Sequence, residues 1–158
     1  MKKVFHFDFL REKYHCDAAV VWCFDNRFDL GFSKFLKRSG MVKTDVIKVA
    51  GGAKCLASPD RDYEREFVLD QILKSIRLHG TKRVILMVHS DCGAYGGLER
   101  FRGDEKAEAL HHQQELQRAA DALLHSISEV EVSGYFAAFD GIWEAQLEVP
   151  AVRSQTPA

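Results

Sequence analysis

The sequence predicts an α/β fold with a mainly parallel β-sheet that is flanked by helices and ends in a C-terminal hairpin strand. Short apolar runs of strand length, at residues 18–23 and 83–89, are separated by longer segments of helical periodicity. Neither run alternates with polar residues, which is typical of parallel strands that helices cover on both faces. Because ligands bind beyond the carboxyl ends of such strands, a functional site is expected where these two runs end.

Length and composition indicate one globular domain. The chain has 158 residues, enough to bury a core without disulfides, and 46% of them are hydrophobic. With 22 basic and 23 acidic residues the net charge is -1, so neither nucleic acid nor an anionic membrane is predicted as a partner. No run suits a signal peptide or a membrane span, which predicts a cytoplasmic protein.

The chain is predicted to divide into an N-terminal arm at residues 1–17, a domain at 18–149 and a loose tail at 150–158. Within the arm, residues 5–9 alternate between phenylalanine and a polar residue. This alternation indicates either a short edge strand or an arm that packs on another subunit.

Local patterns predict the elements of the first half in chain order. After the first strand, helical spacing of apolar residues predicts a helix over 30–38, and a second strand over 45–50 ends at two glycines. Residues 54–61 are predicted to form a loop. A helix over 62–79 is predicted to end at Gly80. Its apolar stripe consists of Phe67, Val68, Ile72, Leu73 and Ile76.

The second half contains the central strand, a loop, a long helix and a hairpin. Three glycines between residues 93 and 97 predict a loop after the strand. A helix is predicted over 105–127, then a strand over 129–139, and Asp140-Gly141 is a two-residue hairpin signal before a strand over 142–147. The side of the long helix that is expected to face inward consists of Leu110, Leu116, Ala120, Leu123, Leu124 and Ile127.

Two of the predicted strands end on residues that bind transition metals. Cys23 closes the first apolar run, and His89 closes the central one, with Cys92 three residues later. Zinc takes cysteine and histidine ligands tetrahedrally, and a catalytic zinc keeps three protein ligands and one open position. Two thiolates and one imidazole would also cancel the charge of Zn²⁺. If the two strand ends lie side by side, these three residues form a zinc site.

The other candidate ligands fit less well. If the chain is extended, Cys16 lies roughly 23 Å from Cys23, at about 3.3 Å per residue. Two sulfurs on one zinc are at most about 4.6 Å apart, so Cys16 is expected to be a core thiol. Cys55 stays open as a minor alternative because its loop could approach the site. His111 and His112 point about 100° apart on a helix and are expected to be solvated or at the edge of the core. The glycines after residue 92 lack the ending of a phosphate loop.

An acid and a base follow the first cysteine, as Cys23-Phe24-Asp25-Asn26-Arg27. If the chain stays extended, Cys23, Asp25 and Arg27 fall on one side. Charged groups beside a buried thiolate are costly unless they pair with each other. Asp25 and Arg27 are therefore candidate catalytic residues; the alternative is an ion pair in a surface loop.

At these residues the sequence resembles the β-class carbonic anhydrases. That family carries Cys-x-Asp-x-Arg after its first strand and His-x-x-Cys after a later one, which stand here as Cys23 to Arg27 and as His89-Ser90-Asp91-Cys92-Gly93. The resemblance covers residues 18 to about 147 in the order of elements and implies a β-carbonic anhydrase-like fold. Where many members have Arg-Asn-Ala-Gly-Asn, this chain has Lys48-Val49-Ala50-Gly51-Gly52. Compared with the family, the leading helices with which members embrace a partner subunit are missing or shortened here.

The resemblance implies reversible hydration of carbon dioxide to bicarbonate by a zinc-bound hydroxide. Cys23, His89 and Cys92 would bind Zn²⁺; Asp25 would orient the hydroxide, and Arg27 would hold Asp25 in place and ionised. A homodimer or a higher homo-oligomer is implied as well. Two alternatives stay open: hydrolysis of a related small electrophile such as carbon disulfide or carbonyl sulfide, and a non-enzymatic interaction module in which Asp25 is a permanent fourth zinc ligand.

Overall fold

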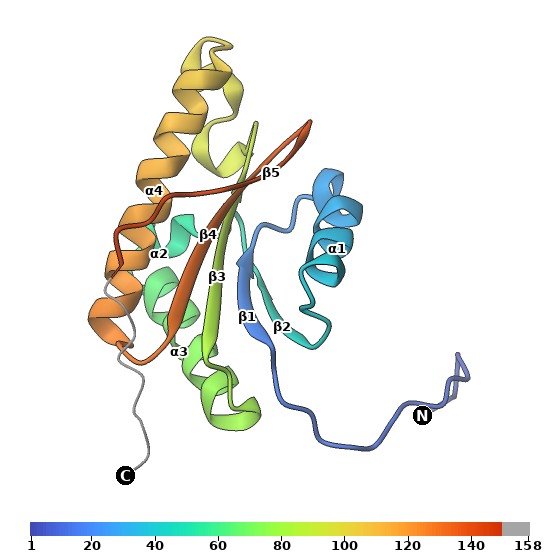
Figure 1. Ribbon diagram of the computed structural model, residues 1–158. Coiled ribbons are helices and arrows are strands. Elements are labelled where there is room, and N and C mark those ends of the chain that lie inside the picture. Colours follow the sequence, from blue (N-terminus) through green and yellow to red (C-terminus); the bar gives the residue numbers. More distant parts are fainter. Residues whose placement is uncertain (150–158) are drawn as a thin grey trace.

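The computed structural model describes residues 1–149, and the predicted tail at 150–158 lies outside the described residues. One five-stranded sheet with strand order β2-β1-β3-β4-β5 forms the centre of the molecule (Figure 1). Four strands run parallel, and β5 is antiparallel to β4, which confirms the predicted fold class. The strands are β1 (Ala18–Trp22), β2 (Thr44–Lys48), β3 (Arg83–His89), β4 (Glu131–Ala138) and β5 (Gly141–Glu144).

Helices cover both faces of the sheet. Helix α1 (Asp29–Arg38) lies on one face, and α2 (Lys54–Ala57), α3 (Asp62–His79) and α4 (Glu105–Ser126) lie on the other (Figure 1). Each face therefore has its own core. Trp22, Phe32 and Met87 belong to the core on the α1 side, while Leu86 and Leu116 belong to the opposite one.

The two central strands lie at the point where the chain changes sides. Every residue of β1 is buried, as is β3 from Val84 onward, as their continuous apolar runs predict. From β1 the chain passes to α1 on one face, and from β3 it passes to α4 on the other. In an open α/β sheet such a switch point between adjacent strands is where ligands bind. Cys23 and His89 stand at this point.

Several predicted details were wrong. Part of the predicted loop at 54–61 is the short helix α2, whose Leu56 is fully buried. The stripe on α3 is narrower than predicted, because Phe67 and Leu73 are exposed while Val68 and Ile72 are buried.

The long helix and the hairpin need similar corrections. Leu110 of α4 is exposed, although it was predicted to face inward. Ala138 pairs with Gly141, so the two residues of the hairpin turn are Phe139 and Asp140, one position earlier than the predicted Asp140-Gly141. Strand β5 also ends at Glu144, three residues before the predicted end.

The N-terminal arm forms no strand, so the edge-strand interpretation was wrong. The chain runs away from the domain before residue 14 (Figure 1), and its apolar side chains are exposed. The arm is attached to the domain from Tyr14 onward. The Tyr14 hydroxyl donates to Asp45 Oδ1 at 2.6 Å, and the backbone N–H of Cys16 donates to His79 O at 3.0 Å. Packing of the arm on another subunit stays a prediction. Among the described residues, no helix has the length and apolarity that crossing a bilayer requires.

Candidate metal centre

The structure brings together the three residues that the sequence selected. One ligand atom from each of Cys23, His89 and Cys92 lies within 4.8 Å of the other two. The three residues are only 3%, 1% and 2% exposed, so their donor atoms meet in a buried space. In the part of the chain that the structure describes, this is the one such group of histidine, cysteine and acidic residues.

Sheet register explains how residues so far apart in sequence converge. Val21 of β1 lies beside Leu86 of β3, and the strands are parallel. Continuing that register by two residues places Cys23 next to Val88, one position from His89. Cys92 then returns to the same point because the turn passes through Asp91, whose φ of 52° is in the left-handed region. Aspartate is one of the few non-glycine residues that adopts this conformation readily.

The imidazole of His89 is oriented for metal binding. Its Nδ1 lies 2.8 Å from the carbonyl oxygen of Ser90, which can only accept, so Nδ1 carries the proton. The lone pair is therefore on Nε2, which is buried and has no hydrogen-bond partner. Buried polar atoms without partners are rare, and here the two thiols lie beside the orphaned nitrogen. This donor set fits a zinc ion.

The two cysteines influence one another strongly. A hydrogen bond from the Cys92 thiol lowers the pKa of Cys23 to about 4, and burial opposes this less strongly than the bond favours it. The same interaction, together with burial, raises the pKa of Cys92. Burial disfavours a charged His89, but the nearby Cys23 sulfur and the Ser90 carbonyl favour the charged form, and the net effect is a raised pKa. Two sulfurs this close need a cation before both can ionise.

Asp25 and Arg27 form the predicted ion pair, but not for the predicted reason. The chain is not extended beyond Cys23, because Asp25 caps a short 3₁₀ helix at Asn26–Phe28 by accepting from the Arg27 backbone N–H at 3.0 Å. The Arg27 guanidinium donates to both carboxylate oxygens, with Nη2 2.7 Å from Oδ2. These bonds hold the pKa of Asp25 at about 2. Oδ2 lies 3.9 Å from His89 Nε2, so the carboxylate borders the metal centre.

Arg27 has a second partner that sequence reasoning missed. Its Nη1 donates to Asp91 Oδ2 and its Nη2 to the Asp91 carbonyl, both at 2.9 Å. Arg27 therefore bridges the segments at the carboxyl ends of β1 and β3, which carry all three potential ligands. Asp91 stands inside the His-x-x-Cys motif, but only the turn geometry shows that it faces Arg27.

Aromatic rings form the border of the centre on the α1 side. The ring of Phe28 lies 4.7 Å from that of His89 and 5.1 Å from that of Phe139. The Cζ atom of Arg27 lies 5.8 Å and 5.7 Å from the centroids of these two phenylalanines. These side chains provide an apolar surface beside the charged groups. Phe139 comes from the β4–β5 turn, and no local signal connected it with the site.

Two glycines, Gly51 and Gly52, lie next to Cys23. A bond from the Gly51 backbone helps to lower the pKa of Cys23. A Cβ on Gly52 would lie 2.4 Å from the carbonyl oxygen of Met87 and 3.0 Å from the backbone nitrogen of Cys23. Only glycine fits this close approach.

The remaining candidates do not join the group. Cys16 and Cys55 are buried elsewhere, and their thiols face the carbonyl oxygens of Ala18 and Ala50. His112 is fully buried, contrary to the expectation of a solvated or core-edge residue.

Comparison with solved structures defines the class of protein by its fold. The carbonic anhydrase of Streptococcus mutans matches with a TM-score of 0.60 and 19% identity, over 89% of this chain and 88% of that chain. A tetrameric β-carbonic anhydrase of the ascomycete Sordaria macrospora matches with a TM-score of 0.55 and 18% identity, over 83% and 81%. The fold is that of the β-carbonic anhydrases.

Sequence comparison then gives the family. The model of the family described as "Putative carbonic anhydrase" matches residues 13–147, and this chain belongs to that family. An uncharacterized protein of Rickettsia conorii is 25% identical over 146 residues, which are 90% of this chain and 78% of the relative.

Proposed function

We propose that this protein is a zinc-dependent carbonic anhydrase that hydrates carbon dioxide reversibly to bicarbonate and a proton. The observation that carries the proposal is the convergence of Cys23, His89 and Cys92 around an imidazole nitrogen that has no other partner. Membership of the carbonic anhydrase family and the β-class fold support the same reaction.

The three residues would hold the ion as two thiolates and one neutral imidazole, which gives a site without net charge. A bound zinc ion supplies Lewis acidity, which lowers the pKa of a water molecule to about 7. The Ser90 carbonyl fixes the tautomer of His89 and so leaves the lone pair of Nε2 free to bind the ion. The backbone of Gly51 and Gly52 lies against Cys23 and helps to keep it in place.

Asp25 orients the water molecule that reacts. As a carboxylate it can only accept hydrogen bonds, so it would bind a hydrogen of that water and leave an oxygen lone pair free for the carbon of the substrate. Arg27 keeps the carboxylate ionised and fixed through two of its nitrogens. Carbon dioxide is apolar, and the rings of Phe28 and Phe139 provide an apolar surface next to these groups.

Arg27 is hydrogen-bonded to both carboxylate oxygens of Asp25. This pairing favours an enzyme over a non-enzymatic interaction module in which the zinc is structural. To become a permanent fourth ligand, Asp25 would have to exchange these bonds for the metal. Arg27 is itself held by Asp91, so the pair is anchored on two loops. This arrangement supports an open fourth position.

The same proposal includes assembly and location. A solved structure of the same fold is described as tetrameric, and the exposed apolar arm of this chain gives a surface for a homo-oligomer. The four cysteines form no disulfide in the structure, which supports the reducing cytoplasm as its location.

Metal analysis and a hydration assay test the function. Purified protein is expected to contain about one zinc per chain, the number that a single three-ligand site binds. Cys92→Ser is expected to lose it, while Cys55→Ser, a matched change of a buried thiol outside the group, keeps it. Stopped-flow measurement should show zinc-dependent hydration that Asp25→Asn lowers by about two to three orders of magnitude, the usual cost of losing a group that acts on the reacting atoms.

Two results would contradict the proposal. If Cys92→Ser retained its full zinc content, the metal would not be bound by this group. If the wild-type protein carried zinc but showed no hydration between about pH 6 and 9, on either side of the pKa expected for metal-bound water, the structural role for zinc would be favoured instead.

A further inference from the structure

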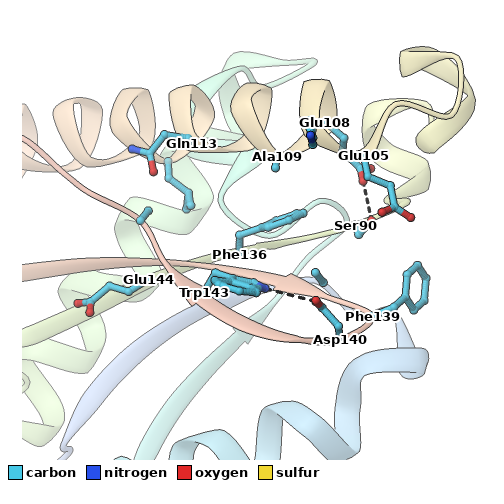
Figure 2. A pocket seen from close by; sticks show the side chains of 14 residues that line it. Ser90, Glu105, Glu108, Ala109, Gln113, Phe136, Phe139, Asp140, Trp143 and Glu144 are labelled. Carbon is cyan, nitrogen blue, oxygen red and sulfur yellow. Dashed lines mark hydrogen bonds between the residues drawn. The ribbon is translucent and has the colours of Figure 1, made fainter.

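One buried carboxylate holds the loop between His89 and Cys92 from the side of α4. Glu108 Oε2 accepts from the Ser90 hydroxyl at 2.5 Å, and Oε1 accepts from the Asp91 backbone N–H at 2.7 Å. Figure 2 shows Glu108 on α4 with its carboxylate directed at Ser90. Two neighbouring donors of the loop are thus matched by the two oxygens of one side chain.

The burial of Glu108 is unusual for a charged residue. It is 1% exposed, and no lysine or arginine pairs with it among the described residues; the Nε2 atom of His112 lies 3.9 Å from its Oε1. A carboxylate in such surroundings is retained only where hydrogen bonds replace its lost water. For Glu108 the lost water is replaced by the Ser90 hydroxyl and the Asp91 backbone N–H.

The loop that Glu108 holds orients two separate parts of the centre. The Ser90 carbonyl accepts from His89 Nδ1 and so sets the direction of the metal-binding nitrogen. Asp91 accepts twice from Arg27 and so sets the guanidinium that holds Asp25. Asp91 also stands at a positive φ, in a left-handed conformation that hydrogen bonds support. That support comes from Glu108 and from the bond between Asp91 Oδ1 and the Leu98 N–H.

We infer that Glu108 is a positioning residue of the metal centre. It touches neither the metal ligands nor the Asp25–Arg27 pair, and it acts on both through Ser90 and Asp91. This inference rests on the metal centre proposed above. It assigns a role to a polar residue on the inward face of α4, where an apolar residue would otherwise be expected.

The chain provides a matched comparison on the same helix. Glu115, two turns later, is also 1% exposed and accepts from the Ser58 hydroxyl at 2.5 Å and from Arg118. Neither Ser58 nor Arg118 belongs to the segment from His89 to Cys92 that Glu108 holds. Any general destabilisation from replacing a buried glutamate on α4 should therefore appear in variants of both residues. Loss of positioning of the metal centre should appear only in variants of Glu108.

The test compares Glu108→Met, Glu108→Gln and Glu115→Met. Methionine keeps the length of the side chain and removes both acceptors, and a cavity of about 760 Å³ beside Glu108 leaves room for it (Figure 2). Glutamine keeps one acceptor for the Asp91 N–H and offers an N–H to Ser90 Oγ. Zinc affinity is measured by competition with a chelator, and the geometry of the centre by the absorption spectrum of the cobalt-substituted protein.

Glu108→Met is expected to lower zinc affinity about 10- to 100-fold, the usual cost of losing a group that orients a metal ligand, and to shift the cobalt bands. Glu108→Gln should lie between it and the wild type, and Glu115→Met should leave the spectrum unchanged. A folded Glu108→Met protein with the affinity and spectrum of Glu115→Met would overturn the inference. If Glu108→Met does not fold, Glu108→Gln decides, and wild-type values for both measurements would overturn the inference.

These readouts do not depend on turnover. A wild-type protein that binds zinc but does not hydrate carbon dioxide refutes the proposed reaction and leaves this test intact. A wild-type protein that binds no zinc refutes both.

Discussion

Replacing Gly52 by alanine should damage the fold and the metal centre together. Gly52 has a φ of 58°, and an added Cβ would lie 2.4 Å from the Met87 carbonyl oxygen and 3.0 Å from the Cys23 nitrogen. Both neighbours are backbone atoms of buried segments next to the centre, so neither can move without shifting β3 or Cys23.

The expected cost has two parts. The left-handed conformation costs an alanine about 1–2 kcal/mol, and forcing an extra carbon into a packed region costs about 1–3 kcal/mol more. The sum, about 2–5 kcal/mol, is a large part of the roughly 5–15 kcal/mol that stabilises an ordinary domain. Gly40 is the control: its φ is 74°, and nothing lies within 4 Å of its added Cβ. Gly40→Ala should therefore lose only the conformational part.

Urea unfolding in excess chelator measures both variants without the stabilisation that bound zinc adds. Zinc affinity is then compared separately, and only Gly52→Ala should lower it, because only this variant displaces Cys23. If the two variants lose the same free energy of unfolding, the close approach at Gly52 is not what requires glycine there.

Two further outcomes follow from residues outside the centre. Burial lowers the pKa of His112 to about 3, whereas a histidine in the unfolded chain has a pKa of about 6.5. Between these two pH values only the unfolded chain binds the proton, so the free energy of unfolding falls as the pH falls. His112→Phe should fill the same space against Phe136 and flatten that decline in urea unfolding across this range; an unchanged slope would contradict it. Deleting residues 1–12 should reduce the assembled mass in light scattering while leaving the thermal unfolding temperature intact, since the arm is attached only from Tyr14; an unchanged mass would assign assembly to another surface.

The buried strands and the residues at their carboxyl ends were the features best predicted from the sequence. Continuous apolar runs identify buried parallel strands, and a residue that ends such a run must emerge at the carboxyl edge of the sheet. Cys23 and His89 could therefore be placed together before the structure was known, although 66 positions separate them. The Asp25–Arg27 pair was predicted from extended geometry, whereas the observed pair depends on a helical turn that Asp25 caps.

The polar face of α4 could not be predicted in this way. Helical periodicity assigns inward positions to apolar residues, so it favoured Leu110, which is exposed, and passed over Glu108, His112 and Glu115, which are buried. A buried carboxylate is stable only if specific donors meet it, and those of Glu108 come from a loop 17 and 18 positions earlier. Nothing in the local pattern of the helix records them.

The bridge from Arg27 to Asp91 joins segments 64 positions apart. Closing so large a loop is entropically unfavourable, and the intervening β2, α2 and α3 must be arranged before the two ends can meet. A nascent chain that has not yet docked β3 against β1 keeps Cys23 apart from His89 and Cys92. If this group binds zinc as proposed, the three ligands can act together only after β1 and β3 have docked, so metal binding would follow that step of folding.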